Sequence, residues 1–438
     1  MEREEKVLQF GEGNFLRAFA DYFIDLLNEQ GLFDGSIVVI QPIERGMVDE
    51  LNSQKGLYTV LLRGISGIKE RLITSISRGV DPYKDFESYI KLARQSKLRY
   101  VISNTTEAGI AYLETDKPSD SPPKSFPAKV VVLLYERYKH FNGAADKGFI
   151  FIPCELIDDS GGRLREIVLR YAEEWELGQG FISWVSEANY FTNTLVDRIV
   201  TGYPEGHNLG HDDRLLVAGE VYSFFAIEAS GWAAAELNEK LPFADIVTDD
   251  VSPYKLRKVR ILNGAHTMSA LAAYLCGKET VGEMMDDPVF VEFLKKGIYE
   301  EIVPFLDVKG SDVENTKEFA ESVFDRFSNP YIKHYLLSIA LNSVSKFRAR
   351  VVPSILEYHR RCGRLPEALT LSFAALVEFY RRGHGVDDEE ILEFFKGQPS
   401  VTEICARADY WGVDINELPD FAGKVSEILE MGIENCLK

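Results

Sequence analysis

The sequence predicts an α/β fold in which a Rossmann-type, doubly wound sheet over residues 1–245 precedes an all-α domain over residues 246–438. The first half alternates short apolar or β-branched runs with amphipathic stretches, which is typical of βαβ units around a mainly parallel sheet. The second half shows helical spacing throughout, with Gly, Pro or Asp between segments. At 438 residues and 45% hydrophobic content, the chain is long and apolar enough for two buried cores.

The N-terminal half begins with an apolar run, VLQF, followed at once by the amphipathic stretch RAFADYFIDLLNEQG, and this pair predicts a strand and a helix. Joints rich in Gly or Pro at 117–127 and 202–212 indicate surface loops. The apolar or β-branched runs are, in chain order, VLQF at 7–10, SIVVIQP at 36–42, LYTVLLRG at 57–64, RYVISN at 99–104, AKVVVLLYERY at 128–138 and GFIFIPCE at 148–155.

The C-terminal half is predicted to be helical from about residue 253, where Ser252 and Pro253 form a suitable helix start. Each later segment repeats apolar residues three or four positions apart. The predicted helical segments are SPYKLRKVRILNGAHTMSALAAYL, DPVFVEFLKKGIYEEIVPFL, NTKEFAESVFDRFSN, PYIKHYLLSIALNSVSKF, VVPSILEYHRRCG, PEALTLSFAALVEFYRRG, DDEEILEFFKGQ and the last forty residues.

The composition limits the partners and the compartment. A net charge of −20 disfavours nucleic acid or an anionic membrane as main partner, because both require a surplus of Lys and Arg. The five cysteines form no CxxC pair, which favours reduced thiols in a cytoplasmic enzyme over a disulfide or zinc framework. The N-terminus has no basic segment followed by an apolar one, and no run of about 18 apolar residues occurs, so we expect neither secretion nor membrane spanning.

The stretch GEGNF, directly after the first predicted strand, is a candidate dinucleotide site. Gly11 and Gly13 allow a tight strand-to-helix turn and close approach of backbone N–H groups to a pyrophosphate, with Asn14 and Phe15 beside them. The third glycine of the full fingerprint is absent, and a glycine pair after a strand also forms ordinary turns. The position at the first βα turn favours the cofactor.

Two further stretches bear on the cofactor. The second strand is followed by Gln41, Pro42 and a late Glu44, so the choice between NAD and NADP is weakly specified, and the lack of an obvious basic cluster favours NAD. Asn104 and Thr105 follow another predicted strand and suit a loop beneath the nicotinamide ribose. A plain β-turn explains the same residues.

Lys258, Asn263 and His266 stand in an otherwise apolar helical segment. At 100° per residue they fall within an arc of about 140°, so all three can face one cleft. A surface Lys, a locally bonded Asn and a satisfied core His are the alternative, but burying all three without a role costs several kcal/mol. The trio suits carbonyl reduction and its reverse: a desolvated amine exchanges a proton, an amide bonds the developing alkoxide, and an imidazole holds a substrate hydroxyl, with no metal required.

The Lys-x4-Asn-x2-His pattern of KVRILNGAH, the TLVDRIV stretch at 194–200 and the GEGNFLRAF start together resemble the mannitol dehydrogenase family, the polyol-specific long-chain dehydrogenases/reductases. The resemblance covers nearly the whole chain. It implies an NAD-dependent, zinc-free reaction with Lys258 as general acid/base, Asn263 as oxyanion donor and His266 as substrate ligand. It also places Asp197 in the active site and Lys346 near the substrate.

Within the family, PCELIDDSGG, TLVDRIVTGYP and SVSKFRARVVPS are most similar to members that reduce the keto-uronate D-tagaturonate to D-altronate. Mannitol-specific members carry a Cys-Asp-Asn stretch where this chain has Cys154-Glu155-Leu156, which disfavours mannitol or fructose and makes Glu155 a candidate for bonding substrate hydroxyls. Lys346 and Arg348 are candidates for binding the uronate carboxylate, because the stretch SKFRAR carries them together with Arg350. His334 lies twelve residues before Lys346. A solvated basic helix end is the alternative.

The expected function is therefore NAD-dependent reduction of a keto-uronate, a small sugar acid, to an aldonate. Fructuronate or a neutral polyol such as mannitol remains an alternative substrate. A sugar-acid or nucleotide-binding regulator without turnover is the alternative from another class, although a pure binder has no use for a tuned proton donor. The sequence leaves the oligomeric state open.

Overall fold

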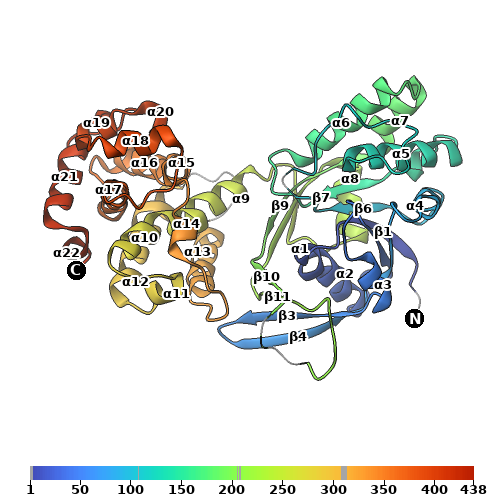
Figure 1. The fold of residues 1–438 in the computed structure, drawn as a ribbon, viewed down its shortest axis with the longest axis horizontal. Helices are drawn as coiled ribbons and strands as arrows, with labels where there is room; N and C mark the ends of the chain where they lie inside the picture. Colours follow the sequence, from blue (N-terminus) through green and yellow to red (C-terminus); the bar gives the residue numbers. More distant parts are fainter. Residues whose placement is uncertain (1–2, 107, 205, 207–208, 307–312) are drawn as a thin grey trace. The chain divides into compact units, whose positions relative to one another are not determined.

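The computed structural model describes residues 3–106, 108–204, 206, 209–306 and 313–438. They form two compact units, Met1–Val251 and Ser252–Lys438, each considered by itself (Figure 1). The first unit extends past the predicted boundary at residue 245, because strand β13 (Ile246–Thr248) pairs in parallel with β12 (Phe224–Glu228). No helix among the described residues is long and apolar enough to cross a bilayer.

The first unit is built on a parallel sheet with the strand order β5-β2-β1-β6-β7-β8. From β1 the sheet grows in one direction through β2 and β5, and in the other through β6, β7 and β8, so the order reverses between β1 and β6. This arrangement confirms the predicted doubly wound sheet. The strands are β1 (Glu5–Phe10), β2 (Ser36–Ile40), β5 (Ile76–Val80), β6 (Tyr100–Ser103), β7 (Ile150–Pro153) and β8 (Tyr190–Phe191).

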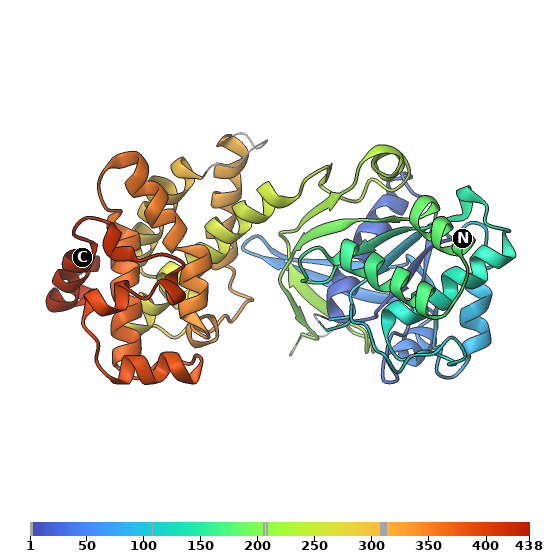
Figure 2. The same cartoon turned by 90° about the horizontal axis from the view of Figure 1, so that it is seen from above.

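Both faces of this sheet are buried, because alternate residues of each strand enter different cores. Val7 and Ile102 point into one core, while Leu8 and Val101 point into the other. The first core is closed by α1 (Asn14–Ala18), α2 (Ala20–Glu29) and α8 (Gly231–Lys240). The second is closed by α4 (Phe86–Leu92), which is blue in Figure 1, and by α5 (Phe126–His140), α6 (Ser160–Glu174) and α7 (Gln179–Ala188), which run from cyan to green in Figures 1 and 2.

Two predicted elements differ in the structure. LYTVLLRG forms a strand, but this strand belongs to a separate sheet of order β10-β11-β3-β4. AKVVVLLYERY lies within helix α5, where the Ser125 side chain accepts a hydrogen bond from the backbone of Ala128 and Pro127 occupies the first turn. The separate sheets contain β3 (Tyr58–Gly64), β4 (Gly67–Ile73), β10 (Val200–Gly202) and β11 (Val217–Glu220), and β13, β12 and β9 (Asn193–Asp197).

The described residues of the second unit form helices and their connections, as predicted. Helix α10 packs against α12, α14, α15, α17 and α22, and its residues are almost all buried. The helices are α9 (Ser252–Arg257), η2 (Lys258–Asn263), α10 (Gly264–Leu275), α11 (Val281–Met285), α12 (Pro288–Lys295), η3 (Lys296–Ile302), α13 (Val313–Phe327), α14 (Leu336–Ile339), α15 (Ser343–Arg350), α16 (Val352–Cys362), α17 (Glu367–Arg381), α18 (Glu389–Lys396), α19 (Val401–Cys405), α20 (Ala408–Trp411), α21 (Phe421–Met431) and α22 (Ile433–Leu437).

The continuous helix predicted over PYIKHYLLSIALNSVSKF is wrong. Only α14 and α15 are helical there, because Asn342 adopts a left-handed conformation with φ of 53° and starts α15 anew. The break has a consequence for the site, since it sets which residues of α15 face α10.

Candidate active site

The turn after β1 is shaped by two glycines with different surroundings. Gly11 has φ of +118°, and a Cβ atom there would lie 2.8 Å from the backbone oxygen of Asn104, so the position accepts only glycine. A Cβ atom on Gly13, by contrast, would meet nothing within 4 Å. The turn is thus tightly packed beneath and open above, which fits the close approach of a pyrophosphate to its backbone N–H groups.

The next two predicted cofactor residues have side chains engaged with their own helices. The Asn14 side-chain oxygen accepts a hydrogen bond of 2.6 Å from Arg17, and the Phe15 ring stacks on Phe19 with 4.8 Å between ring centroids. Arg17, which the sequence did not single out, also donates to the backbone oxygen of Glu12 at 3.2 Å. Arg17 therefore holds the turn to helix α1, while cofactor contacts of Asn14 and Phe15 stay predictions.

Asn104 and Thr105 follow β6, the strand beside β1, so they lie with Gly11 at the carboxyl ends of adjacent parallel strands where the order reverses. Ligands of doubly wound sheets bind at such a point. The Asn104 side-chain amide donates to the Cys154 backbone oxygen at 2.7 Å, which joins this loop to the end of β7. The position fits the predicted cofactor role.

Glu155 and Asp197, the predicted substrate residues of this unit, are both buried. Asp197 ends β9 and is 6% exposed. Glu155 is 3% exposed and its carboxylate accepts hydrogen bonds from Ser103 and Thr105. These contacts tie Glu155 to the loop after β6 rather than leaving it open for a sugar hydroxyl.

In the second unit, Lys258 and Asn263 begin and end a π-helical turn, η2, between α9 and α10. The α-helix expected throughout this stretch is therefore wrong at this turn. In an α-helix residues five apart point about 140° apart, whereas a turn closed by i→i+5 hydrogen bonds brings them toward one side. All three predicted catalytic side chains are half-buried, and the Asn263 amide has no protein hydrogen-bond partner among the described residues.

His266, near the start of α10, lies in a ring cluster. Its imidazole stacks on Phe327 at 4.1 Å between centroids and meets the edge of His334 at 4.9 Å. Burial lowers the pKa of His266 well below its usual value, and the nearby His334, Arg326 and Arg350 lower it further. A neutral imidazole both donates and accepts hydrogen bonds, so His266 can serve a substrate hydroxyl in either sense.

Helix α15 presents Lys346 and Arg350 on one side and Arg348 on another, because residues four apart share a helix face and residues two apart do not. Lys346 and Arg350 are half-buried, and both lower the pKa of His266. Arg348 is exposed and donates to the backbone oxygen of Asp409 at 3.2 Å, in a hollow lined by Asp387, Asp388, Glu390 and Asp409. The geometry thus disfavours Arg348 as a substrate ligand and favours Arg350.

The two cations near His266 have neutral hydrogen-bond partners in the described part of the chain. Lys346 donates to the backbone oxygen of Ile339 at 2.8 Å, and Arg350 donates to the Thr267 hydroxyl at 3.1 Å. Burial lowers the pKa of both, and Arg350 further lowers that of Lys346, while the charge of Asp387 opposes the shift. Half-buried positive charge that is hydrogen-bonded only to neutral groups favours an anionic ligand at this place.

Metal ligation was not predicted. Within the described ranges no group of three His, Cys, Asp or Glu side chains is arranged to hold a metal ion. The expectation of metal-free chemistry stays a prediction.

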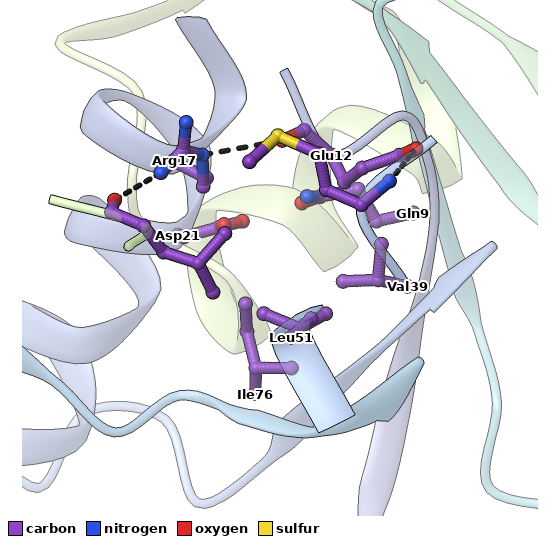
Figure 3. A pocket seen from close by; sticks show the side chains of 9 residues that line it. Gln9, Glu12, Arg17, Asp21, Val39, Leu51 and Ile76 are labelled. Carbon is purple, nitrogen blue, oxygen red and sulfur yellow. Dashed lines mark hydrogen bonds between the residues drawn. The ribbon is translucent and has the colours of Figure 1, made fainter. Parts of the chain in front are cut away.

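A buried polar pocket lies beneath the glycine turn (Figure 3), lined by Gln9 of β1, Glu12 of the turn and Asp21 of α2. It is too narrow for a water molecule. One side-chain oxygen of each of these residues is buried without a hydrogen-bond partner in the described structure. Because no water fits in the pocket to donate to these oxygens, a proton on a carboxyl group is the remaining donor.

Burial raises the pKa of Glu12 and of Asp21, and we infer that Asp21, the more deeply buried of the two, holds this proton. It is fully buried, and burial raises its pKa from 3.8 to about 7, although bonds from Tyr58 and Gln9 and the charge of Arg17 oppose the shift. The Tyr58 hydroxyl donates to one Asp21 oxygen at 2.7 Å. A protonated second oxygen can donate to the otherwise unpartnered Gln9 oxygen, which resolves two unsatisfied acceptors at once.

The glycine turn at the switch point of a doubly wound sheet, together with a half-buried lysine, asparagine and histidine, defines a dinucleotide-dependent oxidoreductase. Residues 5–240 match the mannitol dehydrogenase Rossmann domain and residues 250–431 match the mannitol dehydrogenase C-terminal domain. The chain belongs to the mannitol dehydrogenase family.

Curated relatives cover nearly the whole chain. Altronate oxidoreductase of Escherichia coli O6:K15:H31 is 44% identical over 468 residues, covering 99% of this chain and 96% of the relative, and that of strain O17:K52:H18 is 44% identical over 464 residues, covering 99% and 95%. Two solved structures share the fold. A substrate-free D-sorbitol dehydrogenase has a TM-score of 0.84 at 22% identity, covering 100% of this chain and 95% of its own. Pseudomonas fluorescens mannitol 2-dehydrogenase with NAD and D-mannitol has a TM-score of 0.67 at 24% sequence identity, covering 100% of this chain and 94% of its own.

The raised pKa of Asp21 makes a prediction for stability. An acid whose pKa is higher in the folded state stabilises the fold while it is protonated, and this contribution is lost as the pH rises from about 4 through about 7. The free energy of unfolding should therefore fall by roughly 4 kcal/mol over this range, at about 1.4 kcal/mol per pKa unit. Asp21→Asn places an amide N–H where the proton stands, so we expect its stability to change less with pH and to exceed that of the wild type at pH 8. Urea unfolding at pH 5 and pH 8 measures both. Exposed Asp34 provides the control, Asp34→Asn, which should follow the wild type; the same pH dependence in Asp21→Asn would contradict the assignment.

Proposed function

We propose that the protein is an NAD-dependent oxidoreductase that reduces the keto-uronate D-tagaturonate to D-altronate, and catalyses the reverse oxidation. The relatives named altronate oxidoreductase, 44% identical over nearly the whole chain, support this reaction. The observation that carries the substrate class is the pair of half-buried cations beside His266, Lys346 and Arg350, whose hydrogen-bond partners among the described residues are neutral groups. A sugar acid offers these cations a carboxylate and so a charge-assisted pair, whereas a neutral polyol offers only hydroxyl oxygens.

NAD, when bound, supplies or accepts the hydride. Gly11, Gly13 and the loop of Asn104 and Thr105 would hold it, because the turn leaves its backbone open above Gly13 and meets the loop after β6 at the switch point. The open turn supports this site on the chain's own geometry.

In the second unit each residue has a separate task. Lys258 gives a proton to the substrate oxygen during reduction and takes one during oxidation. The Asn263 amide, free of protein partners among the described residues, donates a hydrogen bond to that oxygen as negative charge develops. Neutral His266 bonds a neighbouring hydroxyl, and Lys346 with Arg350 binds the carboxylate.

Fructuronate is the second candidate substrate, because it offers the same carboxylate to the same cations. Mannitol or another polyol is less favoured for the reason given above. A regulator without turnover is disfavoured by the Lys258, Asn263 and His266 set, which a binding protein would not require. We place the enzyme in the cytoplasm as part of this proposal, on the strength of its five free cysteines.

The first test compares substrates. Purified protein should oxidise NADH with tagaturonate faster than with fructuronate, and fructose should be turned over least, because it has no carboxylate for Lys346 and Arg350. Initial rates at 340 nm over a range of each substrate give kcat/KM. Equal or better use of fructose would contradict the uronate assignment, and better use of fructuronate would exchange the first candidate for the second.

The second test removes the proton donor. Lys258→Ala should lower kcat by about a hundredfold to ten-thousandfold, the range that general acid/base groups typically contribute, while NADH binding measured by fluorescence stays within about twofold. Lys255→Ala, at an exposed position of α9, is the control and should keep full activity. Activity within about tenfold of the wild type in Lys258→Ala would contradict the assignment.

The third test separates the two arginines of α15. Arg350→Gln should raise KM for tagaturonate about tenfold to a hundredfold, the range expected when a charged hydrogen bond of about 1.5–3 kcal/mol is lost, and leave fructose turnover unchanged. Arg348→Gln, two residues away on another side of the helix, should stay within about twofold for both substrates. Equal effects of the two substitutions, or a parallel fall with fructose, would show that Arg350 does not bind the carboxylate.

A further inference from the structure

Glu155 lies directly after β7 and joins that strand to the loop after β6. One of its carboxylate oxygens accepts hydrogen bonds from the backbone N–H and the hydroxyl of Thr105, both at 3.0 Å. The other accepts from the Ser103 hydroxyl at 3.0 Å. Three donors therefore converge on a side chain that is 3% exposed.

The residue between these two donors connects the loop to the cofactor turn. Asn104 donates from its backbone to Phe10 at 3.1 Å and from its side chain to Cys154 at 2.7 Å. Its backbone oxygen lies where a Cβ atom of Gly11 would approach to 2.8 Å. A shift of Asn104 would thus press on Gly11 or leave a gap beside it, so the shape of the turn depends on how the loop is fixed.

A carboxylate suits this place because it accepts hydrogen bonds with both oxygens and donates none. Burial raises the pKa of Glu155, while the bonds from Thr105 and Ser103 lower it and so favour the charged acceptor. A glutamine has one oxygen and one NH₂ group, so it would turn a donor either toward the Thr105 backbone N–H, which cannot accept, or toward Ser103, whose hydroxyl would have to turn from donor to acceptor. The hydroxyl of Thr105 also fills the space beside Gly109, where a Cβ atom would lie 2.0 Å from it, so the loop has little room to adapt.

We propose that Glu155 is a positioning residue of the cofactor site, which holds Ser103, Asn104 and Thr105 against the Gly11 turn, and that it is not a substrate ligand. The inference rests on the proposed use of NAD. It assigns discrimination of the sugar acid to the second unit's cations and leaves Glu155 to set cofactor affinity.

The test compares cofactor and substrate binding in Glu155→Gln. We expect the Kd of NADH, measured by fluorescence titration, and the KM for NADH to rise at least about tenfold. At saturating NADH, kcat should stay within about threefold and the KM for tagaturonate within about twofold. A residue needed only for folding would lower all activity together with the fraction of folded protein, and would not separate the two KM values.

Thr105 and an exposed glutamate provide the comparison variants. Glu187→Gln, at an exposed position of α7, makes the same chemical change away from the loop and should bind NADH within about twofold of the wild type. Thr105→Val keeps the backbone donor but loses the hydroxyl and should weaken NADH binding by an intermediate factor. If Glu155→Gln does not fold by circular dichroism, Thr105→Val and Ser103→Ala, each of which removes one donor, decide the question by the same measurements.

The outcomes are distinct. A raised KM for tagaturonate with an unchanged Kd for NADH in Glu155→Gln would make Glu155 a substrate ligand and overturn the inference. An unchanged Kd for NADH in every variant would overturn it as well, although the wild type would still bind NADH and the proposed function would stand. A wild-type protein that does not bind NADH would refute the proposed cofactor and the inference with it.

Discussion

The close packing of the Asn104 carbonyl against Gly11, which leaves no room for a Cβ atom, sets the geometry of the first unit's candidate site. It occurs where the strand order of the sheet reverses, and it exists only because Gly11 has no β carbon and adopts a left-handed φ of +118°. The loops after β1 and β6 can then lie against one another. On the far side the loop is fixed from β7, and beneath the turn Asp21 is buried with a raised pKa and accepts a hydrogen bond from Tyr58, in a pocket too narrow for water. The open backbone above Gly13 is what this packing leaves for a ligand.

The second unit gathers positive side chains in a chain that is acidic as a whole. The chain carries a net charge of −20, yet Lys346, Arg350 and the two imidazoles gather near the π turn. Burial is the main cause of the lowered pKa of His266, and the same cations lower it further while they offer positive charge to an anion. A neutral imidazole beside a cationic pair distinguishes the hydroxyl and carboxylate groups of a sugar acid by chemistry as well as by position. Burial strengthens both effects, because water does not screen charges there as it does at a surface.

The sequence was sufficient for the parallel sheet and for the turn of Gly11 and Gly13 after β1, because periodicity and short-range spacing express them. The catalytic roles of Lys258, Asn263 and His266 stay a prediction. The sequence was insufficient wherever a contact depends on elements distant in the chain. Glu155 accepts a hydrogen bond from Thr105 only because β6 and β7 are neighbours in the sheet, and no local sequence pattern predicts that these two strands pair. Arg350 could be separated from Arg348 only once the structure showed Arg350 bonded to Thr267 of α10 and Arg348 bonded to Asp409. The buried run in α5 is apolar on so many sides that its period did not distinguish helix from strand.

The π turn makes the number of residues between the lysine and the asparagine a structural quantity. If this stretch took ordinary α-helical hydrogen bonds instead, Lys258 and Asn263, five positions apart, would point about 140° apart. The amine and the amide would then part even though both were still encoded. The spacing of these two residues and the π geometry of the turn therefore depend on each other. In distant homologues, a gap of four residues between them would require the same π turn, whereas a gap of three would place them together on an ordinary α-helix.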